Sequence, residues 1–217
     1  NKNKGLFESI NGKINDITFS QSKINFEIDK NIFLSASIKN TLNLDEKNSR
    51  KYAPIIPSFI LSNKFNLNGN LTNELTLTLD KTFKIIDYNL KINGLIKDSF
   101  IDLSKPIQNS ILDKNIKKIF FNKTNINFSQ SNQGSKVLNL NGKYKINNDF
   151  LEFKVSNQIS KKKNNINLDV IIDEGVNIPV INYNKNPSKI GNLKIQFEIF
   201  KKYFFFKNID YKEGANK

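Results

Sequence analysis

Apolar residues recur at every second position along almost the whole chain. Successive side chains of a β-strand point to opposite faces of the sheet, so a period of two is typical of half-buried strands. The spacing therefore predicts about a dozen strands. The alternating sets lie at residues 24–28, 32–38, 65–71, 75–79, 88–96, 124–128, 138–146, 153–155, 166–172 and 193–199.

The positions between these apolar residues are mainly Lys, Asn, Thr, Asp and Glu, which gives each strand one apolar and one polar face. One-faced strands are typical of antiparallel sheets, whereas the strands of a buried parallel sheet are apolar on both faces. Polar segments of turn composition, such as 29–31 and 147–149, separate the alternating sets. We therefore predict an all-β fold, built as a long antiparallel meander with at most one short helix.

Three segments depart from the alternation. Segment 45–58 contains charges and prolines and predicts a long connection. The run Tyr203-Phe204-Phe205-Phe206 places rings on both faces of one strand, which we expect to be buried on both sides; the alternative is contact with membrane lipid or a following domain. Apolar residues after Pro106 have helical spacing compatible with a short amphipathic helix capped by Ser104, and these are Ile107, Ile111, Leu112, Ile116 and Ile119.

A short pattern of apolar, Asn, Gly, any residue, apolar occurs four times, at 10–14, 67–71, 92–96 and 140–144. Asn-Gly is the commonest signal for a two-residue hairpin, which is one interpretation of these sites. The apolar alternation nevertheless continues through each glycine, and this favours a strand that runs straight on. Each glycine then lies on the apolar face, where a missing side chain permits a bend or the close approach of a ligand or another backbone.

The sequence has no His, Cys, Met or Trp. This composition excludes catalysis by His or Cys, disulfide bonds and thiolate metal sites. Ser-x-x-Lys begins at Ser20 and Ser160, but the partner motifs Ser-Asp-Asn and Lys-Thr-Gly are absent. Carboxylates such as Asp169, Asp173 and Glu174 are candidates for paired acid/base work only if they meet in space. We expect a protein that is not an enzyme and has no cofactor or metal.

The formal net charge of +14 raises the question of nucleic-acid binding. Lys, Asn and Ile make up 101 of 217 residues, while Arg occurs once, as Arg50, and Ala three times. This bias is typical of an AT-rich coding sequence. Lysines scattered along the chain with a single Arg are poorly suited to bidentate recognition of guanine or phosphate. We expect no nucleic-acid partner and a solvated lysine surface, with a secondary attraction to anionic lipid headgroups.

No segment of the sequence has the length and composition of a membrane span. No uncharged stretch is longer than a dozen residues, and the most apolar stretch of that length, 52–63, contains Pro54 and Pro57. Because the chain contains no Met, we expect it to be a piece of a longer polypeptide or a processed form.

The predicted strands together present a large apolar surface that has to be covered. One solution is closure of the sheet as a sandwich or barrel. The other is an open, strongly curved sheet whose apolar face accommodates hydrocarbon chains. At about 0.8 kcal/mol per buried methylene, a two-tailed lipid of roughly thirty methylenes gains on the order of 20 kcal/mol in such a trough.

Several segments resemble the AsmA-like bacterial envelope proteins, and most of all the YhdP-type branch. The resemblance is carried by the alternating strands with apolar-x-Gly-x-apolar sites, by segment 141–151 (NGKYKINNDFL) and by segment 204–216 (FFFKNIDYKEGAN). It implies a curved, groove-like sheet that belongs to a long β-groove, anchored in the inner membrane and reaching across the periplasm. Residues 1–217 would form one continuous segment of this groove, without the anchor.

The function implied is that of a bridge-like lipid transporter, whose apolar groove carries phospholipid tails between the inner and outer membranes. Its partners would be phospholipid acyl chains, the inner-membrane anchor and the flanking strands of the full-length chain. The alternative is a closed β-sandwich that serves as a binding or adhesion module without a lipid conduit. Residues that alternate within the clearest strands are the candidates for lining the groove: Leu140, Tyr144, Ile146, Phe153, Leu168, Val170, Ile195 and Phe197.

Overall fold

A computed structural model describes residues 3–14, 17–49, 58–107, 115–132, 134, 136–147, 149–160, 162–178, 182–187, 189–201 and 203–214. It contains fourteen strands and one single-turn helix. The elements are β1 (Asn3–Ile14), β2 (Ile17–Ile28), β3 (Ile32–Asp45), α1 (Ser58–Leu61), β4 (Lys64–Leu79), β5 (Ile85–Ile96), β6 (Ser99–Ile107), β7 (Ile116–Ser131), β8 (Lys136–Lys145), β9 (Leu151–Ile159), β10 (Asn164–Ile172), β11 (Val176–Ile178), β12 (Tyr183–Lys185), β13 (Gly191–Ile199) and β14 (Phe204–Glu213).

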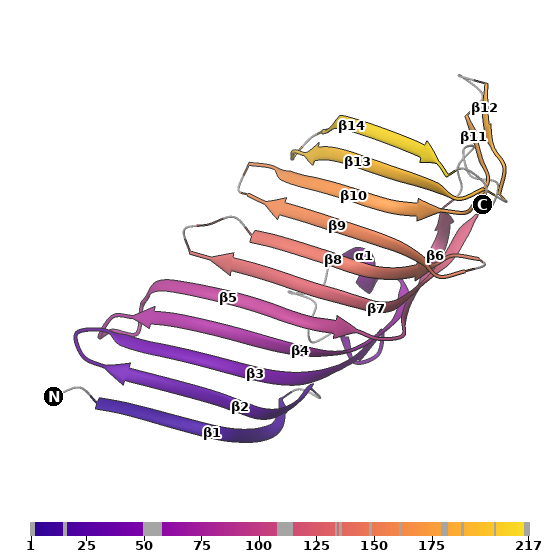
Figure 1. Cartoon of the computed structure of the whole chain (residues 1–217). Coiled ribbons are helices and arrows are strands. Elements are labelled where there is room, and N and C mark those ends of the chain that lie inside the picture. The colour runs from indigo at the N-terminus through magenta and orange to yellow at the C-terminus, as the bar shows by residue number, and fades with distance from the viewer. Residues whose placement is uncertain are drawn as a thin grey trace.

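The strands form one long antiparallel meander, as Figure 1 shows. Its order is β1-β2-β3-β4-β5-β7-β8-β9-β10-β13-β14, while β6 bridges β4 and β7, and β11 pairs with β12 in a separate hairpin. Among the described residues β1 and β14 do not pair with each other, so the sheet is open and has two free edges. The predicted all-β meander is therefore confirmed, and the described part does not form the two packed sheets of a sandwich.

The apolar residues of neighbouring strands meet in rows that run across the sheet. Leu34 of β3 lies opposite Phe26 of β2 and Leu77 of β4. Because the pairing keeps this parity from strand to strand, the alternation of each strand adds up to one continuous apolar face. The polar residues between them form the opposite face.

The helical spacing after Pro106 does not produce a helix in the described residues. Ser104 and Ile107 belong to β6, Ile116 and Ile119 belong to β7, and Ile111 and Leu112 lie outside the described residues. β6 and β7 pair antiparallel, with Ile101 opposite Ile119, and this pairing outweighs the local spacing. Ser104 does not cap a helix, because its backbone amide and hydroxyl both donate to Asn63 Oδ1, at 2.7 and 3.1 Å.

The helix that does form, α1, lies on the connection between β3 and β4. β3 ends at Asp45 and β4 begins at Lys64, so the predicted connection 45–58 lies between these two strands. Residues 50–57 within it lie outside the described residues.

All four Asn-Gly sites lie inside strands, in β1, β4, β5 and β8, and none is a hairpin turn. A Cβ atom on Gly94 would lie 2.3 Å from the backbone oxygen of Asn70, and one on Gly69 would lie 2.6 Å from that of Leu95. The glycines thus allow adjacent strands to approach closely where the sheet coils. The sequence left open whether these glycines permit a bend or a close approach, and the structure shows the close approach of another backbone at Gly69 and Gly94.

Three residues inside strands adopt left-handed backbone conformations at irregularities of the ladder. They are Ser9, Gln21 and Lys123, with φ of 55°, 48° and 47°, and each lies at a register shift. An extra residue in one strand bends it and increases the local twist. These bulges and the close-packed glycines together explain why the sheet is curved rather than flat.

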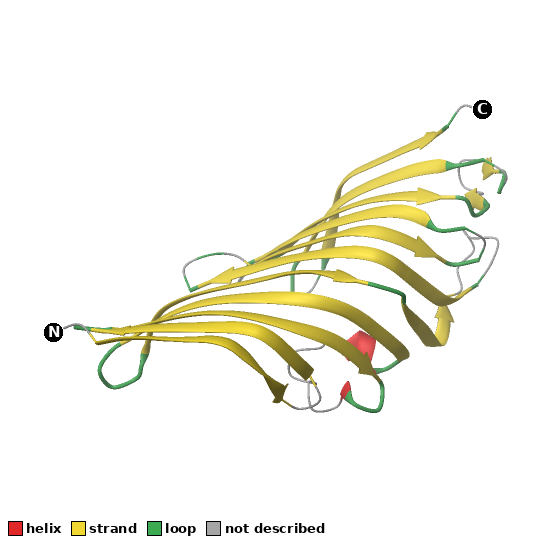
Figure 2. Ribbon diagram, turned by 60° about the horizontal axis from the view of Figure 1, so that its bottom comes forward, coloured by secondary structure: helices red, strands yellow, loops and turns green. Residues whose placement is uncertain are grey.

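A compact core covers part of the apolar side of the curved sheet. Leu44, Phe65, Ile101 and Leu103 are buried there, and Ile60 and Leu61 of α1 and its end pack against them. In Figure 2 the strands arch over α1, which therefore lies on the concave, apolar side. The remainder of that side has no such cover among the described residues.

Candidate functional site

Seven of the eight predicted lining residues lie on the apolar face of β8, β9, β10 and β13. Leu140, Leu168 and Ile195 belong to a single row, joined through Val155 of β9. Phe153 and Val170 lie opposite each other in the next row. Tyr144 and Phe197 extend the same face towards its two sides, while Ile146 lies just beyond the end of β8.

These side chains are half-buried, with the exception of Phe153, which is 8% exposed. Phe153 is enclosed by the edge-on rings of Phe121 and Tyr144, at centroid distances of 5.8 and 6.1 Å. Half-burial in a folded sheet means that neighbouring rows cover the flanks of each side chain while its end faces solvent. The apolar face over β8 to β13 is thus a surface open to a ligand.

Tyr144 fixes one side of this surface. Its hydroxyl donates to the backbone oxygen of Ile171 at 2.7 Å, so that β8 is linked to β10 across β9. Burial, reinforced by the nearby charges of Asp173 and Glu174, raises the pKa of Tyr144 to about 12. The phenol therefore stays protonated at neutral pH and keeps its role as a donor.

An apolar hollow on this face lies over the last three strands of the sheet. It measures about 610 Å³ and is bordered by Leu168, Ile195, Phe197, Ile199, Phe200, Tyr203, Phe204 and Phe206. Phe200 and Tyr203 stack at 4.6 Å across the β13–β14 turn, which widens the aromatic wall of the hollow.

The aromatic run at 203–206 is not buried on both sides, contrary to the sequence-based expectation. Tyr203 is 61% exposed and Phe204 63%, and Phe205 and Phe206 are also exposed. The reason is that β14 is the last strand of the sheet and no neighbour covers its outer edge among the described residues. The strand therefore offers apolar rings to the groove side and to the polar side alike.

Several polar residues interrupt the apolar face, and two pairs of them bond to each other. The amide of Asn73 donates to Asn40 Oδ1 at 2.5 Å and to the backbone oxygen of Ile38 at 3.2 Å. Gln130 donates to the hydroxyl of Tyr88 at 2.6 Å. Mutual bonding lets these groups lie among apolar side chains without a large desolvation cost. These pairs were not predicted from the sequence, although their polar residues are visible there as breaks in the alternation.

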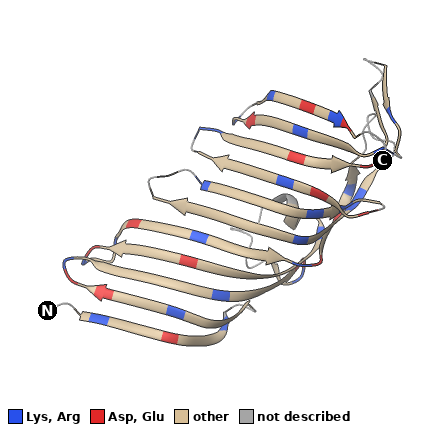
Figure 3. Cartoon of the chain, viewed as in Figure 1, with Lys and Arg blue, Asp and Glu red and all other residues tan. Residues whose placement is uncertain are grey.

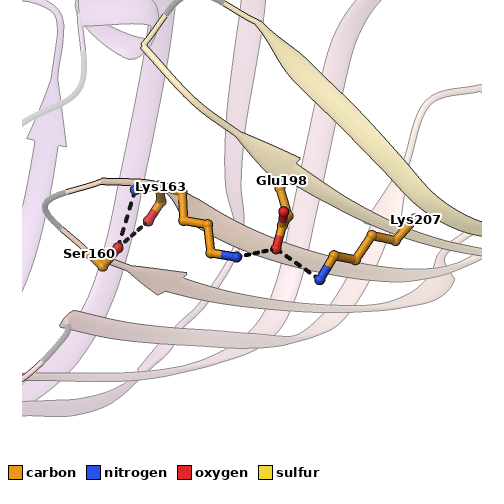
Figure 4. A network of polar contacts seen from close by, with 4 residues as sticks. All are labelled: Ser160, Lys163, Glu198 and Lys207. Atoms are coloured by element: carbon orange, nitrogen blue, oxygen red, sulfur yellow. Dashed lines mark hydrogen bonds and ion pairs between the residues drawn. The ribbon is translucent and has the colours of Figure 1, made fainter.

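The polar face carries a cluster that ties the last strands together, shown in Figure 4. Glu198 of β13 accepts from Lys163 at 2.5 Å and from Lys207 of β14 at 2.8 Å. These two lysines hold the pKa of Glu198 below its ordinary value. Ser160 closes the β9–β10 turn by donating its hydroxyl to the backbone oxygen of Lys163 at 2.8 Å, which positions this lysine.

The polar face also has a hollow of its own, of about 460 Å³, bordered by residues such as Asn141, Lys154 and Asn167. Asp169 and Lys194 also border it, and they form an ion pair at 3.7 Å. Within the described ranges no group of three or more acidic residues is placed to hold a metal ion. The same ranges contain no helix of the length and apolarity needed to cross a bilayer.

No family model, curated protein or solved structure matches this chain.

Proposed function

We propose that this chain is a segment of an AsmA-like envelope protein of the YhdP type, and that its apolar groove carries phospholipid tails between the inner and outer membranes. The lining residues are Leu140, Tyr144, Ile146, Phe153, Leu168, Val170, Ile195 and Phe197. In this proposal the protein has no catalytic role, and its ligands are the acyl chains themselves.

The observation that carries the proposal is an apolar face left uncovered over β8 to β14 in a single open sheet. Soluble proteins rarely expose a contiguous apolar surface of this kind unless something binds to it. A ligand for this face has to be apolar and long, because the rows of Leu, Ile, Val and Phe run across many strands. Acyl chains meet both requirements, and their burial is favourable at about 0.8 kcal/mol per methylene.

The two free edges of the sheet support the view that the groove continues beyond this segment. Eleven strands follow one another along the main path of the sheet. At about 4.8 Å between neighbours they form a groove on the order of 50 Å long. Edge strands carry unpaired backbone N–H and C=O groups, and in this proposal flanking strands of the full-length chain pair with them. The proposed setting is the periplasm, with an inner-membrane anchor in a part of the protein outside this chain.

A pair of matched substitutions tests the proposal. Leu168 lies on the apolar face, opposite Val155 and Ile195, whereas the adjacent Asn167 points to the polar face, opposite Ser156 and Gln196. Leu168→Glu places a carboxylate in the path of the tails, and we expect it to interrupt transfer of a fluorescent phospholipid between vesicles. Asn167→Glu adds the same charge one residue away and should leave transfer unchanged.

Equal effects of the two substitutions would contradict the groove. That result would favour a binding or adhesion module without a lipid conduit, because the two faces of the sheet would then be equivalent for the measured activity. Circular dichroism and the urea midpoint of each variant establish that both remain folded.

A further inference from the structure

The two long sides of the groove differ in charge. Five hairpin loops line one side, which we call the hairpin rim. Figure 3 shows both basic and acidic residues at the strand ends on the left of the sheet. In the described residues these loops hold six lysines and two aspartates. The loops of the hairpin rim are 29–31, 80–84, 132–135, 160–163 and 200–203.

The loops on the other long side, which we call the opposite rim, lack this excess of positive charge. In the sequence these ranges hold five basic and five acidic residues, against eight lysines and two aspartates in the ranges of the hairpin rim. These loops are 46–63, 97–98, 146–150, 173–175 and 186–190. A composition rich in Lys enriches both sides alike, so composition does not explain a difference between two sides of the same sheet.

One of the two aspartates on the hairpin rim is occupied within its own loop. Asp80 Oδ1 accepts hydrogen bonds from the Thr82 amide, the Thr82 hydroxyl and the Lys84 amide, at 2.8, 2.6 and 3.0 Å. The Asp80 carboxylate is therefore hydrogen-bonded within the turn, whereas the side chains of Lys81 and Lys84 are exposed. The side chains that this loop presents to solvent are thus mainly positively charged.

The same loop also exposes an aromatic ring. Phe83 is 72% exposed and has φ of 63°, a left-handed conformation that is unfavourable for a bulky residue. The hydrogen bonds made by Asp80 hold the loop in this shape. At the far end of the rim, the exposed Tyr203 and Phe204 lie next to Lys201 in the same way. Lysines beside exposed rings are typical of surfaces that meet the boundary between lipid headgroups and acyl chains.

We propose that lipids whose tails lie in the groove direct their headgroup phosphates to the hairpin rim, where Lys81, Lys84, Lys162 and Lys201 attract them. This proposal rests on the proposed function, because it requires tails in the groove. A phosphodiester is anionic at neutral pH, so the cationic hairpin rim attracts it more strongly than the charge-balanced opposite rim. The ligand is thus a phosphate-bearing lipid, held in one orientation along the groove.

The test compares two lipids that carry the same fluorescent acyl chain, phosphatidylglycerol and diacylglycerol. The rim variant is Lys81→Gln/Lys84→Gln/Lys162→Gln/Lys201→Gln. The control variant, Lys47→Gln/Lys64→Gln/Lys97→Gln/Lys105→Gln, removes four exposed lysines from the other side and has the same net charge. We expect the rim variant to bind phosphatidylglycerol about tenfold more weakly, which corresponds to about 1.4 kcal/mol, and to bind diacylglycerol as the wild type does. The control should bind both lipids as the wild type does.

The outcomes separate the two proposals. If the wild type binds both lipids equally and the rim variant is unchanged, the tails occupy the groove and the headgroup proposal is wrong. A loss of phosphatidylglycerol binding in the control as large as in the rim variant also overturns it. If neither lipid binds, the proposed function itself fails. The rim variant is also sedimented with phosphatidylglycerol vesicles. If it no longer sediments with the vesicles but still binds the fluorescent phosphatidylglycerol as the wild type does, the rim docks on a bilayer surface and does not hold headgroups in the groove.

Discussion

The apolar face of the sheet has a covered part and an open part, and both are built from the same alternation of apolar residues. Phe65 is completely buried in the cluster beneath α1, and Leu103 is 3% exposed, whereas Leu168 and Ile195 are only half-buried. The strands are alike in pattern, so the difference comes from the connections. The helix α1 packs over the first region, where β6 also pairs with β4 and β7 within the sheet, and nothing in the described residues lies over the second.

The largest expected effect is a loss of stability in the covered part of the apolar face. Phe65→Ala removes a ring that contacts Leu44, Ile101 and Leu103, and a cavity of this kind should lower the free energy of unfolding by about 3–5 kcal/mol. Leu168→Ala removes a half-exposed side chain, and its cost should fall well below that range. Urea unfolding of both variants measures the contrast, and equal losses would mean that the open face is packed as a core.

A smaller effect is expected where the sheet coils. Gly94→Ala brings a Cβ against the backbone oxygen of Asn70, which cannot move aside without disturbing the ladder, so we expect a loss of about 1–3 kcal/mol. Gly214→Ala is the control, since its nearest neighbour, the oxygen of Ile190, lies at 3.6 Å. The same urea measurement applies. A neutral Gly94→Ala would show that the close approach of β4 and β5 is not required for the curvature.

The smallest expected effect is on stability, through the Glu198 ion pairs on the polar face of β13 and β14. Glu198 has a pKa below its ordinary value of 4.5 in the folded state, because Lys163 and Lys207 bond to its carboxylate. Its contribution to stability is therefore present above pH 4.5 and is lost as the pH falls through the lowered pKa.

Glu198→Gln should consequently lower the urea midpoint at neutral pH, and its difference from the wild type should disappear in acid. Glu74→Gln, at an exposed glutamate of β4, removes the same charge and serves as the control. A deficit of Glu198→Gln that persists unchanged in acid would show that the ion pairs are not its cause.

Most of the sheet could be predicted from the sequence, because the period of two reports directly which face of a strand is apolar. The continuation of strands through Gly69 and Gly94 was also predictable, since the alternation is unbroken there. The hydrogen-bonded pairing of β6 with β7 was not, because helical spacing at Ile107 and Ile116 is a local signal and strand pairing is a contact between distant segments.

The environment of each strand was the less predictable part. The exposure of Tyr203 and Phe204 depends on the absence of a neighbour beyond β14 in the described sheet, which no property of the run itself indicates. The seven strand residues expected to line the groove do share one face, since that follows from parity alone. Whether a face is sealed depends on connections such as α1, whose position is set by tertiary packing.

The central claim is that acyl chains occupy the open apolar face, and crosslinking from that face tests it most directly. A photoreactive residue at position 168, in a protein with enough flanking strand to stay soluble, is irradiated after expression, and crosslinked lipids are identified by mass spectrometry. The account predicts phospholipid attached at position 168 and none when the photoreactive residue is at position 167. A lipid-free protein at both positions would contradict it.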